Sequence, residues 1–143
     1  IQLELGYLVL AESPYKEIGE IDRPSIRVGV SQGSSSQGIL TREFKSARVV
    51  PATSLKQAQD MLKEKKIDAF ATNKGILFEM SDELSGSRVM DGRWGLENLA
   101  IAIPKGRDLA RPFLDEFAAS VQVNGQLQSA VKRAGLRGAA NTR

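Results

Sequence analysis

The sequence predicts an α/β fold, in which a small and mostly parallel β-sheet carries helices on its faces. Three times in succession, a short apolar stretch is followed by an amphipathic stretch, at residues 26–46, 48–62 and 67–80. The connecting segments have the lengths typical of β-α units, and such units favour a parallel sheet. The length of 143 residues suits one domain, and the apolar fraction of 41% is sufficient for a packed core.

The beginning of the chain predicts a strand at residues 2–10. Apolar side chains alternate there with more polar positions, which is the period of a half-buried strand. The apolar members of this alternation are Leu3, Leu5, Tyr7 and Val9. Residues 11–24 are polar and contain two prolines, so they predict a connection with one short helical turn near residues 15–19.

The stretch Val28–Ser36 predicts a strand, a tight turn and the start of a helix, because a short apolar run ends in Gly33 and three serines. The first backbone N–H groups of a helix lack partners within the helix and carry partial positive charge, so this end can hold an anion. Taken alone, the serines favour a simpler interpretation, in which Ser34 or Ser35 caps the helix.

Two further strand-to-helix units follow. A capping box is predicted at Ser54 and Gln57, before a helix with apolar residues at helical spacing. Residues 67–71 predict a buried strand, and Asn73 directly precedes the next helix. Asn73 is therefore a helix cap or a ligand contact, and the sequence alone leaves both interpretations open.

The last part of the chain predicts two strands and two helices. Residues 88–90 and 96–103 predict strands, and the glycine-flanked loop between them carries Trp94, which either stacks on a ligand or covers an apolar edge. Apolar residues at helical spacing predict an amphipathic helix, and a second helix follows Asn124–Gly125. The marking residues of the first helix are Leu109, Phe113, Phe117 and Val121. The tail from Arg137 predicts disorder.

Composition excludes several functions. The chain has no Cys and no His, no metal-ligand spacing and no phosphate-loop or dinucleotide motif, so we expect no metal and no cofactor. The net charge of +3 comes without dense basic runs, so nucleic acid is not an expected partner. No apolar run is long enough to span a membrane. The chain opens at Ile1 within a predicted strand, so we expect it to be a piece of a longer protein.

Four segments resemble the second half of the amino-acid-type (family 3) extracellular solute-binding proteins of ABC transporters. They are residues 26–37, 54–62, 66–73 and 99–106, and their order and spacing agree over about residues 1–136. The resemblance implies a type 2 periplasmic-binding-protein-like lobe, with a small mostly parallel sheet, flanking helices and one antiparallel hinge strand.

The same resemblance implies a division of the chain. Residues 1–13 would hold the outgoing hinge strand, 14–95 the second ligand-binding lobe, and 96–104 the returning hinge strand. Residues 105–136 would form C-terminal helices that pack on a first lobe absent from this chain, and 137–143 would be a tail.

The resemblance also implies site residues. Gly33, Ser34 and Ser35 match the family's Gly-Thr-Thr/Ser turn, Ser36 follows it, and these residues would hold a carboxylate. Asn73 stands where the family has an aspartate that pairs with the ligand's ammonium group, and an amide cannot neutralise a buried ammonium. We therefore expect a ligand that is not a simple α-amino acid, or another carboxylate in place of that aspartate. Trp94 completes the predicted ligand contacts.

The function implied is non-enzymatic. The chain would be part of a solute-binding component that closes on a small anionic or zwitterionic solute and is read by ABC transporter membrane subunits, in the periplasm or at an extracellular membrane surface, after removal of a signal peptide. The alternatives are a ligand-sensing domain and a dehydratase-type enzyme of the same fold.

The missing first lobe has a physical consequence. We expect the apolar face of the helix at Leu109, Phe113 and Phe117, and of the strand at Leu3–Val9, to lose its partner surface. These surfaces would then pair with another copy, through strand exchange or a helix-mediated dimer, or with the missing part supplied as a separate piece.

Overall fold

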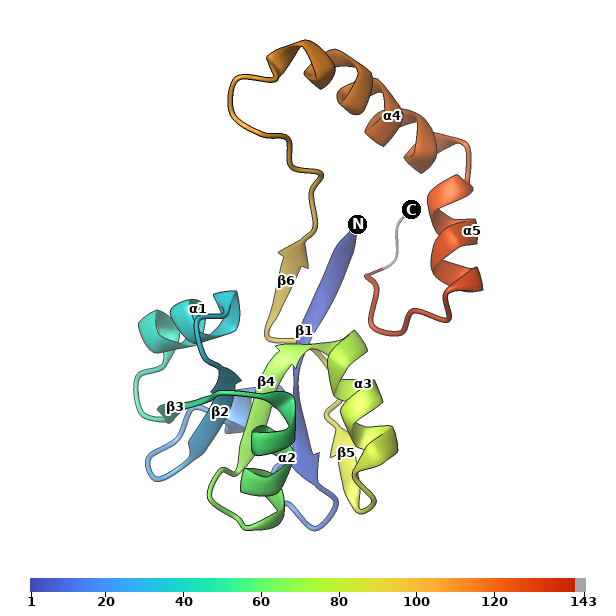
Figure 1. Ribbon diagram of the computed structural model, residues 1–143. Helices are drawn as coiled ribbons and strands as arrows, with labels where there is room; N and C mark the ends of the chain where they lie inside the picture. The colour runs from blue at the N-terminus through green and yellow to red at the C-terminus, as the bar shows by residue number, and fades with distance from the viewer. Residues whose placement is uncertain (141–143) are drawn as a thin grey trace.

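The fold is a six-stranded sheet with helices on both faces and two further helices at the C-terminal end (Figure 1). The computed structural model describes residues 1–140. The strands are β1 (Gln2–Leu10), β2 (Arg27–Ser31), β3 (Arg48–Ala52), β4 (Ala69–Asn73), β5 (Ser87–Val89) and β6 (Gly95–Asn98). The helices are η1 (Ile18–Glu20), α1 (Ser35–Glu43), α2 (Leu55–Lys63), α3 (Lys74–Glu83), η2 (Asp108–Ala110), α4 (Arg111–Val123) and α5 (Gln126–Arg133).

The strand order is β3-β2-β4-β1-β5, and β6 also pairs with β1. The strand β2 is parallel to β3 and β4, whereas β1 is antiparallel to β4, β5 and β6. Five strands therefore share one direction and β1 opposes them. This confirms the predicted α/β fold with a mostly parallel sheet and one antiparallel strand.

Strands β5 and β6 together act as one interrupted strand beside β1. Leu5 pairs with Asn73 of β4 on one side and with Gly95 of β6 on the other. The backbone N–H groups of Met90 and Trp94 continue the pairing, each 2.9 Å from its acceptor on β1. The residues between them bulge outward as a loop, and β1 is thus bonded along both of its edges.

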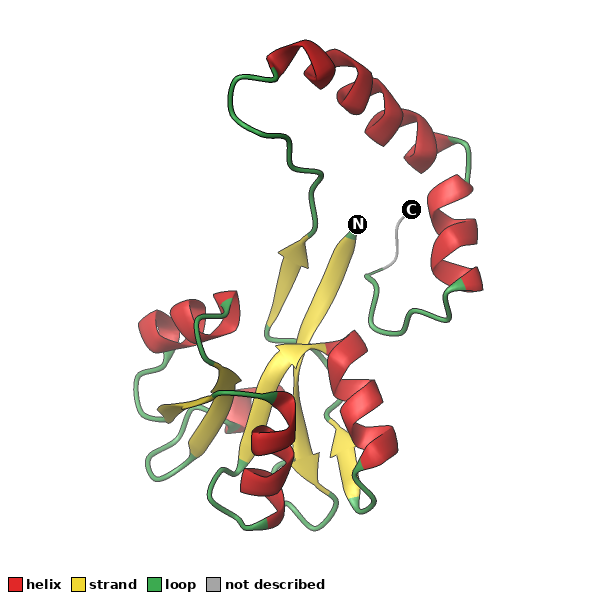
Figure 2. Ribbon diagram, in the orientation of Figure 1, coloured by secondary structure: helices red, strands yellow, loops and turns green. Residues whose placement is uncertain are grey.

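Helices lie on both faces of the sheet (Figure 2), and apolar side chains form a layer beneath them on each face. One layer packs strand residues against α1 and the loop before β2. Its fully buried members include Tyr7, Val9, Val28, Val30, Ala69, Ala71 and Leu40. The other layer packs the opposite face against α2 and α3. Its buried members include Leu8, Phe70, Ala58, Leu62, Leu77 and Met80. Because side chains alternate across a strand, Tyr7 and Leu8 enter different layers.

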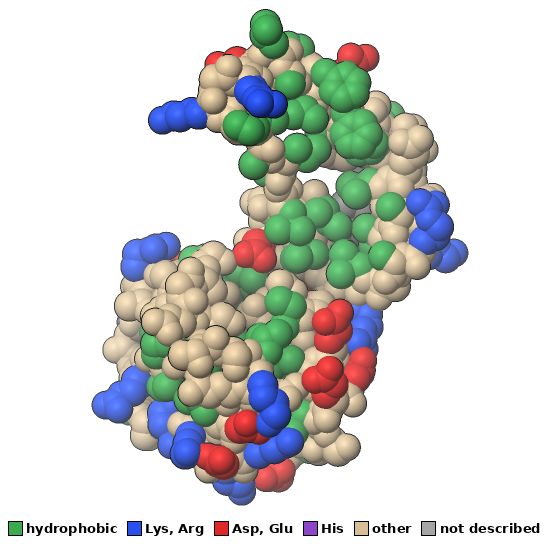
Figure 3. Space-filling view, viewed as in Figure 1, with side chains coloured by type: hydrophobic (Ala, Val, Ile, Leu, Met, Phe, Trp, Pro, Cys, Tyr) green, Lys and Arg blue, Asp and Glu red, His purple; other side chains and the backbone are tan. Residues whose placement is uncertain are grey.

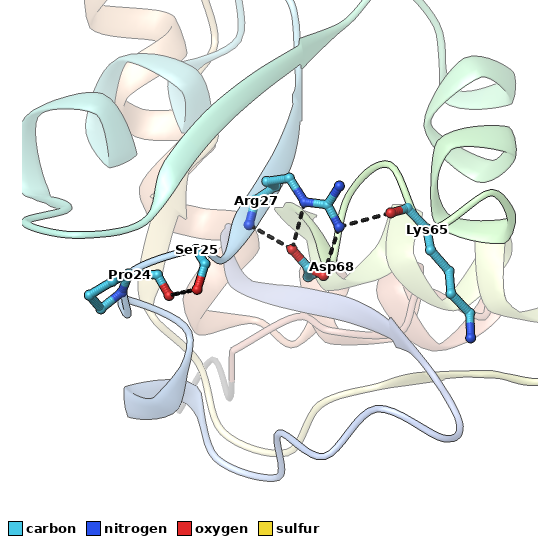
Figure 4. A network of polar contacts seen from close by, with 5 residues as sticks. All are labelled: Pro24, Ser25, Arg27, Lys65 and Asp68. Atoms are coloured by element: carbon cyan, nitrogen blue, oxygen red, sulfur yellow. Dashed lines mark hydrogen bonds and ion pairs between the residues drawn. The ribbon is translucent and has the colours of Figure 1, made fainter.

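A polar clamp joins the starts of β2 and β4 (Figure 4). The backbone N–H and the Nε of Arg27 donate to Oδ2 of Asp68 at 2.8 and 3.1 Å, and its guanidinium also reaches Oδ1 at 3.1 Å. The same guanidinium donates to the carbonyl oxygen of Lys65 at 2.8 Å. Hydrogen bonding to Asp68 raises the pKa of Arg27. The clamp fixes the sheet edge opposite the predicted ligand site.

The predicted strand at residues 96–103 is shorter in the structure. The strand β6 ends at Asn98, and residues 99–107 form neither helix nor strand. Pairing of β6 with β1 reaches Gln2, and the N–H of Leu99 still donates to the carbonyl oxygen of Ile1 at 2.9 Å. Beyond this point no strand of residues 1–140 lies alongside, so the apolar run at residues 99–103 is left unpaired.

The predicted disorder of the tail is wrong for residues 137–140. Gly138 accepts a hydrogen bond from the N–H of Glu4 at 2.8 Å, and the N–H of Ala140 donates to Gln2 at 3.0 Å. Leu3 forms a bridge with Ala139, so this segment continues the β4 side of β1 after β4 has ended. The segment is ordered because it satisfies backbone groups of β1 that β4 leaves unpaired. The small residues of the tail do not predict this pairing. Residues 141–143 lie outside the described residues.

The expected exposure of the strand at Leu3–Val9 is also wrong. Leu3, Leu5 and Val9 are at most 6% exposed, because β4, β5, β6 and the C-terminal segment surround β1. The predicted apolar helix face is exposed as expected: Leu109 of η2 is 99% exposed and Phe113 of α4 is 70% exposed. Figure 3 shows hydrophobic side chains gathered on this upper part of the molecule.

Candidate functional site

The candidate site lies at the edge of the sheet where β2, β3 and β4 end and three helices begin. A side-chain oxygen caps each helix. Ser34 accepts from the N–H of Gln37 at 3.1 Å, Ser54 from Gln57 at 3.0 Å, and Asn73 from Ile76 at 3.1 Å. The strands β2 and β4 are neighbours, so α1 and α3 begin at the same edge of the sheet, α1 on one face and α3 on the other (Figure 1). Their dipoles add partial positive charge at one edge.

The turn before α1 depends on Gly33, which has a φ of +76° that other residues rarely adopt. Its N–H donates to Oε1 of Gln37 at 2.7 Å. The start of α2 has the same arrangement, since the N–H of Thr53 donates to Oε1 of Gln57 at 2.6 Å. The predicted capping box is therefore only half correct: Gln57 bonds the residue before Ser54.

The three serines of the turn, predicted as ligand contacts, have different partners. Ser34 caps α1, as the simpler interpretation proposed. The hydroxyl of Ser35 donates to Oε1 of Glu97 at 2.8 Å. Ser36 is only 3% exposed, and its hydroxyl makes no hydrogen bond within the described residues. The backbone N–H groups of Ser35 and Ser36 also have no acceptor there. This turn therefore offers unused donors.

Asn73 uses only one end of its amide. Its Oδ1 caps α3, while its Nδ2 makes no hydrogen bond within residues 1–140. Next to it, Lys74 has a side chain that is 12% exposed and an Nζ that lies 3.2 Å from Oε2 of Glu4. Arg93 approaches the other oxygen of Glu4 at 3.2 Å. Two cations thus share the Glu4 carboxylate.

Trp94 lies against the core. Its Nε1 donates to the carbonyl oxygen of Gly6 at 2.9 Å, and its ring stacks on Tyr7 with centroids 6.1 Å apart. Burial, with the nearby carboxylates Asp22 and Glu43, raises the pKa of Tyr7. Within the described part of the chain, Trp94 has no hydrogen bond or ring contact with the serine turn. The geometry fits the covering role, and a ligand contact of Trp94 stays a prediction.

Sequence reasoning missed Glu97. Its position opposite Leu3 in the register places its side chain on the face that α1 covers, and only the strand pairing reveals this. The one signal in the sequence is indirect. The resemblance implies an aspartate at the position of Asn73, so another carboxylate was an expected substitute for it.

A separate hollow of about 980 Å³ lies between residues 99–101 and the helices α4 and α5. Its lining is mainly apolar and includes Leu99, Ile101, Phe117, Val121 and Leu127. Figure 3 shows this hollow above the sheet. None of the predicted ligand contacts lines it.

Residues 1–140 lack two other features. No group of three or more His, Cys, Asp or Glu side chains there could hold a metal ion. No helix in that range is sufficiently long and apolar to cross a membrane.

Neither a protein-family model nor a curated protein matches the sequence. Solved structures do match. An arginine-bound amino acid ABC transporter substrate-binding protein from Streptococcus pneumoniae has a TM-score of 0.76 at 13% identity, over 99% of this chain and 60% of that one. A lysine complex of a binding component of an ABC transporter from Wolinella succinogenes gives 0.74 at 22% identity, over 93% and 59%.

A third similar structure is an ancestral amino-acid-binding protein described as a precursor of cyclohexadienyl dehydratase. It has a TM-score of 0.73 at 17% identity and covers 93% of this chain and 58% of its own. The chain thus spans somewhat more than half the length of these proteins. At these identities the likeness establishes the fold: this chain has the fold of the amino-acid-binding proteins of ABC transporters, as the sequence resemblance predicted.

Proposed function

We propose that this chain is the second lobe, with hinge strands and C-terminal helices, of the solute-binding component of an ABC transporter. One observation carries the proposal: the unused donors at the start of α1 and the capping Asn73 of α3 lie at the same edge of the sheet, where the neighbouring strands β2 and β4 end. In open α/β sheets, ligands bind outside the carboxyl ends of the strands, which is where both helices begin.

The chemistry of this edge favours a small anionic or zwitterionic solute. The N–H groups of Ser35 and Ser36, the Ser36 hydroxyl and the Nδ2 of Asn73 are all donors. Hydrogen bonds from such donors to a carboxylate are charge-assisted and about twice as strong as neutral ones. The starts of α1 and α3 each place partial positive charge at this edge of the sheet, which favours a carboxylate there.

The opposite wall of the cleft would come from a first lobe outside this chain. The structural neighbours are longer than this chain, and the apolar face of α4 has no cover within residues 1–140. The strands β1 and β6 pair from Leu5 to Gln2 and lead toward that side, so they would serve as the hinge. Binding would close the lobes, and the membrane subunits of a transporter would read the closed form.

The proposed function implies a location in the periplasm, or at an extracellular membrane surface, after cleavage of a signal peptide. It also makes the exposed faces of α4 and α5 a contact for the first lobe, with pairing of two copies as the alternative use of that surface. No cofactor takes part in the proposed binding.

A thermal-shift screen of the complete two-lobed protein tests the proposal, with amino acids and organic acids as ligands. A ligand at one hundred times its Kd stabilises the folded state by about 2.7 kcal/mol, which is easily seen. Ser36→Ala should abolish most of the shift, because it removes a buried donor. Ser54→Ala, which uncaps α2, is the matched control and should lower the melting temperature without reducing the shift.

Two results would contradict the proposal. The first is a protein that none of these solutes stabilises. The second is steady turnover of a bound acid, which would indicate the dehydratase-type alternative. A complete reading frame that joins this fold to a signalling module would instead favour the sensor alternative.

A further inference from the structure

Glu97 occupies a defined place at the candidate site. In β6 it pairs with Leu3, so its side chain lies on the sheet face that α1 covers. Its Oε1 accepts the hydroxyl hydrogen of Ser35 at 2.8 Å, and the residue is partly buried. The carboxylate is therefore held one hydrogen bond away from the start of α1.

This carboxylate has no cation. Within the described residues, no Lys or Arg forms an ion pair with Glu97, although the adjacent strand β1 carries a well-paired carboxylate. Lys74 and Arg93 both pair with Glu4, whose side chain points to the opposite face of the sheet from that of Leu3. A partly buried carboxylate without a cation costs desolvation energy that a single hydroxyl only partly offsets.

Ser36 gives a second, independent observation. The residue is only 3% exposed, yet its hydroxyl has no hydrogen-bond partner within residues 1–140. No fully buried side-chain polar atom lacks a partner in that range, so the hydroxyl retains an opening to solvent. Because the hydroxyl keeps this opening and has no protein partner, it is available to a ligand acceptor.

We propose that Glu97 is the ligand's ammonium partner, so that the solute is a zwitterion with its carboxylate on Ser35 and Ser36 and its ammonium on Glu97. The inference rests on the proposed function and names the ligand class within it. An α-amino acid carries its ammonium and carboxylate groups on the same carbon atom. This matches the Glu97 carboxylate, which itself contacts the serine turn. Asn73 cannot take the role, because its oxygen caps α3 and only its donor end remains.

Glu97 would also disfavour the binding of dicarboxylates. A dicarboxylate would bring a second negative charge close to the Glu97 carboxylate, which like-charge repulsion disfavours. The same turn would therefore select amino acids over the corresponding hydroxy acids and diacids.

Calorimetric titration of the complete protein tests this inference. The probes are the amino acid that gives the largest thermal shift, its α-hydroxy-acid analogue and succinate. We expect the amino acid to bind at least tenfold more tightly than either acid. Glu97→Gln should weaken amino-acid binding at least tenfold and should leave the hydroxy acid unchanged or tighter. Glu83→Gln, which removes a carboxylate that contacts Gln59 in the second apolar layer, is the control and should change neither affinity.

A double variant separates a direct role from a structural one. The double variant Asn73→Asp/Glu97→Gln has a carboxylate at the capping position before α3, so it should recover much of the amino-acid affinity. Equal amino-acid affinity of wild type and Glu97→Gln would overturn the inference. So would tighter binding of an acid than of the amino acid by wild type, although solute binding itself would then stand. If none of the probes binds, the proposed function fails as well.

Discussion

Arg137 and Asp82 are 55 positions apart in the chain, and the guanidinium of Arg137 nevertheless donates to both carboxylate oxygens of Asp82, at 2.6 and 3.3 Å. The guanidinium also lies 4.9 Å from the centroid of the Phe78 ring, on the same helix α3. Hydrogen bonding to Arg137 lowers the pKa of Asp82. These contacts hold the C-terminal segment beside β1.

Arg137→Ala should release that segment without unfolding the sheet. We expect faster amide hydrogen exchange at Glu4 and Ala140, whose N–H groups bond across this junction, while amides of β2 and β4 stay protected. Lys132→Ala on α5 is a control for loss of a C-terminal charge. Unchanged exchange at Glu4 in Arg137→Ala would show that the backbone bonds alone hold the segment.

Gly138→Ala should be more destabilising than an ordinary glycine substitution. A Cβ at this position would lie 2.5 Å from Cβ of Lys74 and 3.0 Å from its backbone carbon, and the φ is +76°. Gly86 has a φ of +78° with nothing within 4 Å, so Gly86→Ala measures the conformational cost alone, about 1–2 kcal/mol. Urea unfolding should give a larger loss for Gly138→Ala, and equal losses would exclude the steric conflict.

The carboxylate of Asp22 should make stability sensitive to acid. It accepts three backbone N–H bonds, from Lys45, Ser46 and Ala47 at 2.8–2.9 Å, and these lower its pKa from the usual 3.8. A depressed pKa stabilises the fold above the unfolded value and loses that effect as the pH falls toward the folded value. The free energy of unfolding should therefore be level above about pH 5 and fall below about pH 4.

Asp22→Asn provides the comparison for this pH dependence. The variant cannot ionise, so its free energy of unfolding should vary less between pH 5 and acid pH than that of wild type. Asp91→Asn, in the exposed loop between β5 and β6, should keep the wild-type dependence. If Asp22→Asn has the wild-type pH profile, other carboxylates dominate the acid transition.

Substitutions at two phenylalanines should distinguish the core from the surface that we propose contacts the first lobe. Phe70 is fully buried, so Phe70→Ala should lower the free energy of unfolding of the isolated chain by about 3–5 kcal/mol. Phe113 is 70% exposed, and Phe113→Ala should change it by no more than about 0.5 kcal/mol. In the complete protein, Phe113→Ala should become clearly destabilising, because the first lobe would cover it. The same small effect in both settings would mean that α4 lies elsewhere in the whole molecule.

Local patterns in the sequence predicted much of the sheet. The alternation at residues 2–10 gave the bounds of β1, and the apolar runs before Gly33 and Asn73 located β2 and β4 to within two residues. These segments are paired and buried as their periodicity requires. Residues 99–103 form an apolar run that also favours a strand, but no strand of the described residues pairs with it, since pairing depends on a neighbouring strand and not on the local pattern.

The site was predictable only in part. Ser34 and Asn73 precede helices, so their capping contacts follow from local sequence. Glu97 and Ser35 are 62 positions apart, and their contact exists only because β6 pairs with β1 in one register. A shift of one residue would turn the Glu97 side chain to the other face. No local pattern contains that information.

The central strand also has a consequence for biosynthesis. All the partners of β1 in the sheet, namely β4, β5, β6 and residues 138–140, follow it in the chain. On a ribosome that adds about 5–20 residues per second, the nascent β1 waits for several seconds before β4 emerges and a few seconds more before β5 and β6 cover its other edge. An unpaired apolar strand invites intermolecular association. A chaperone that holds extended chains would therefore bind the β1 segment, and depletion of that chaperone should cause aggregation during synthesis and not after it.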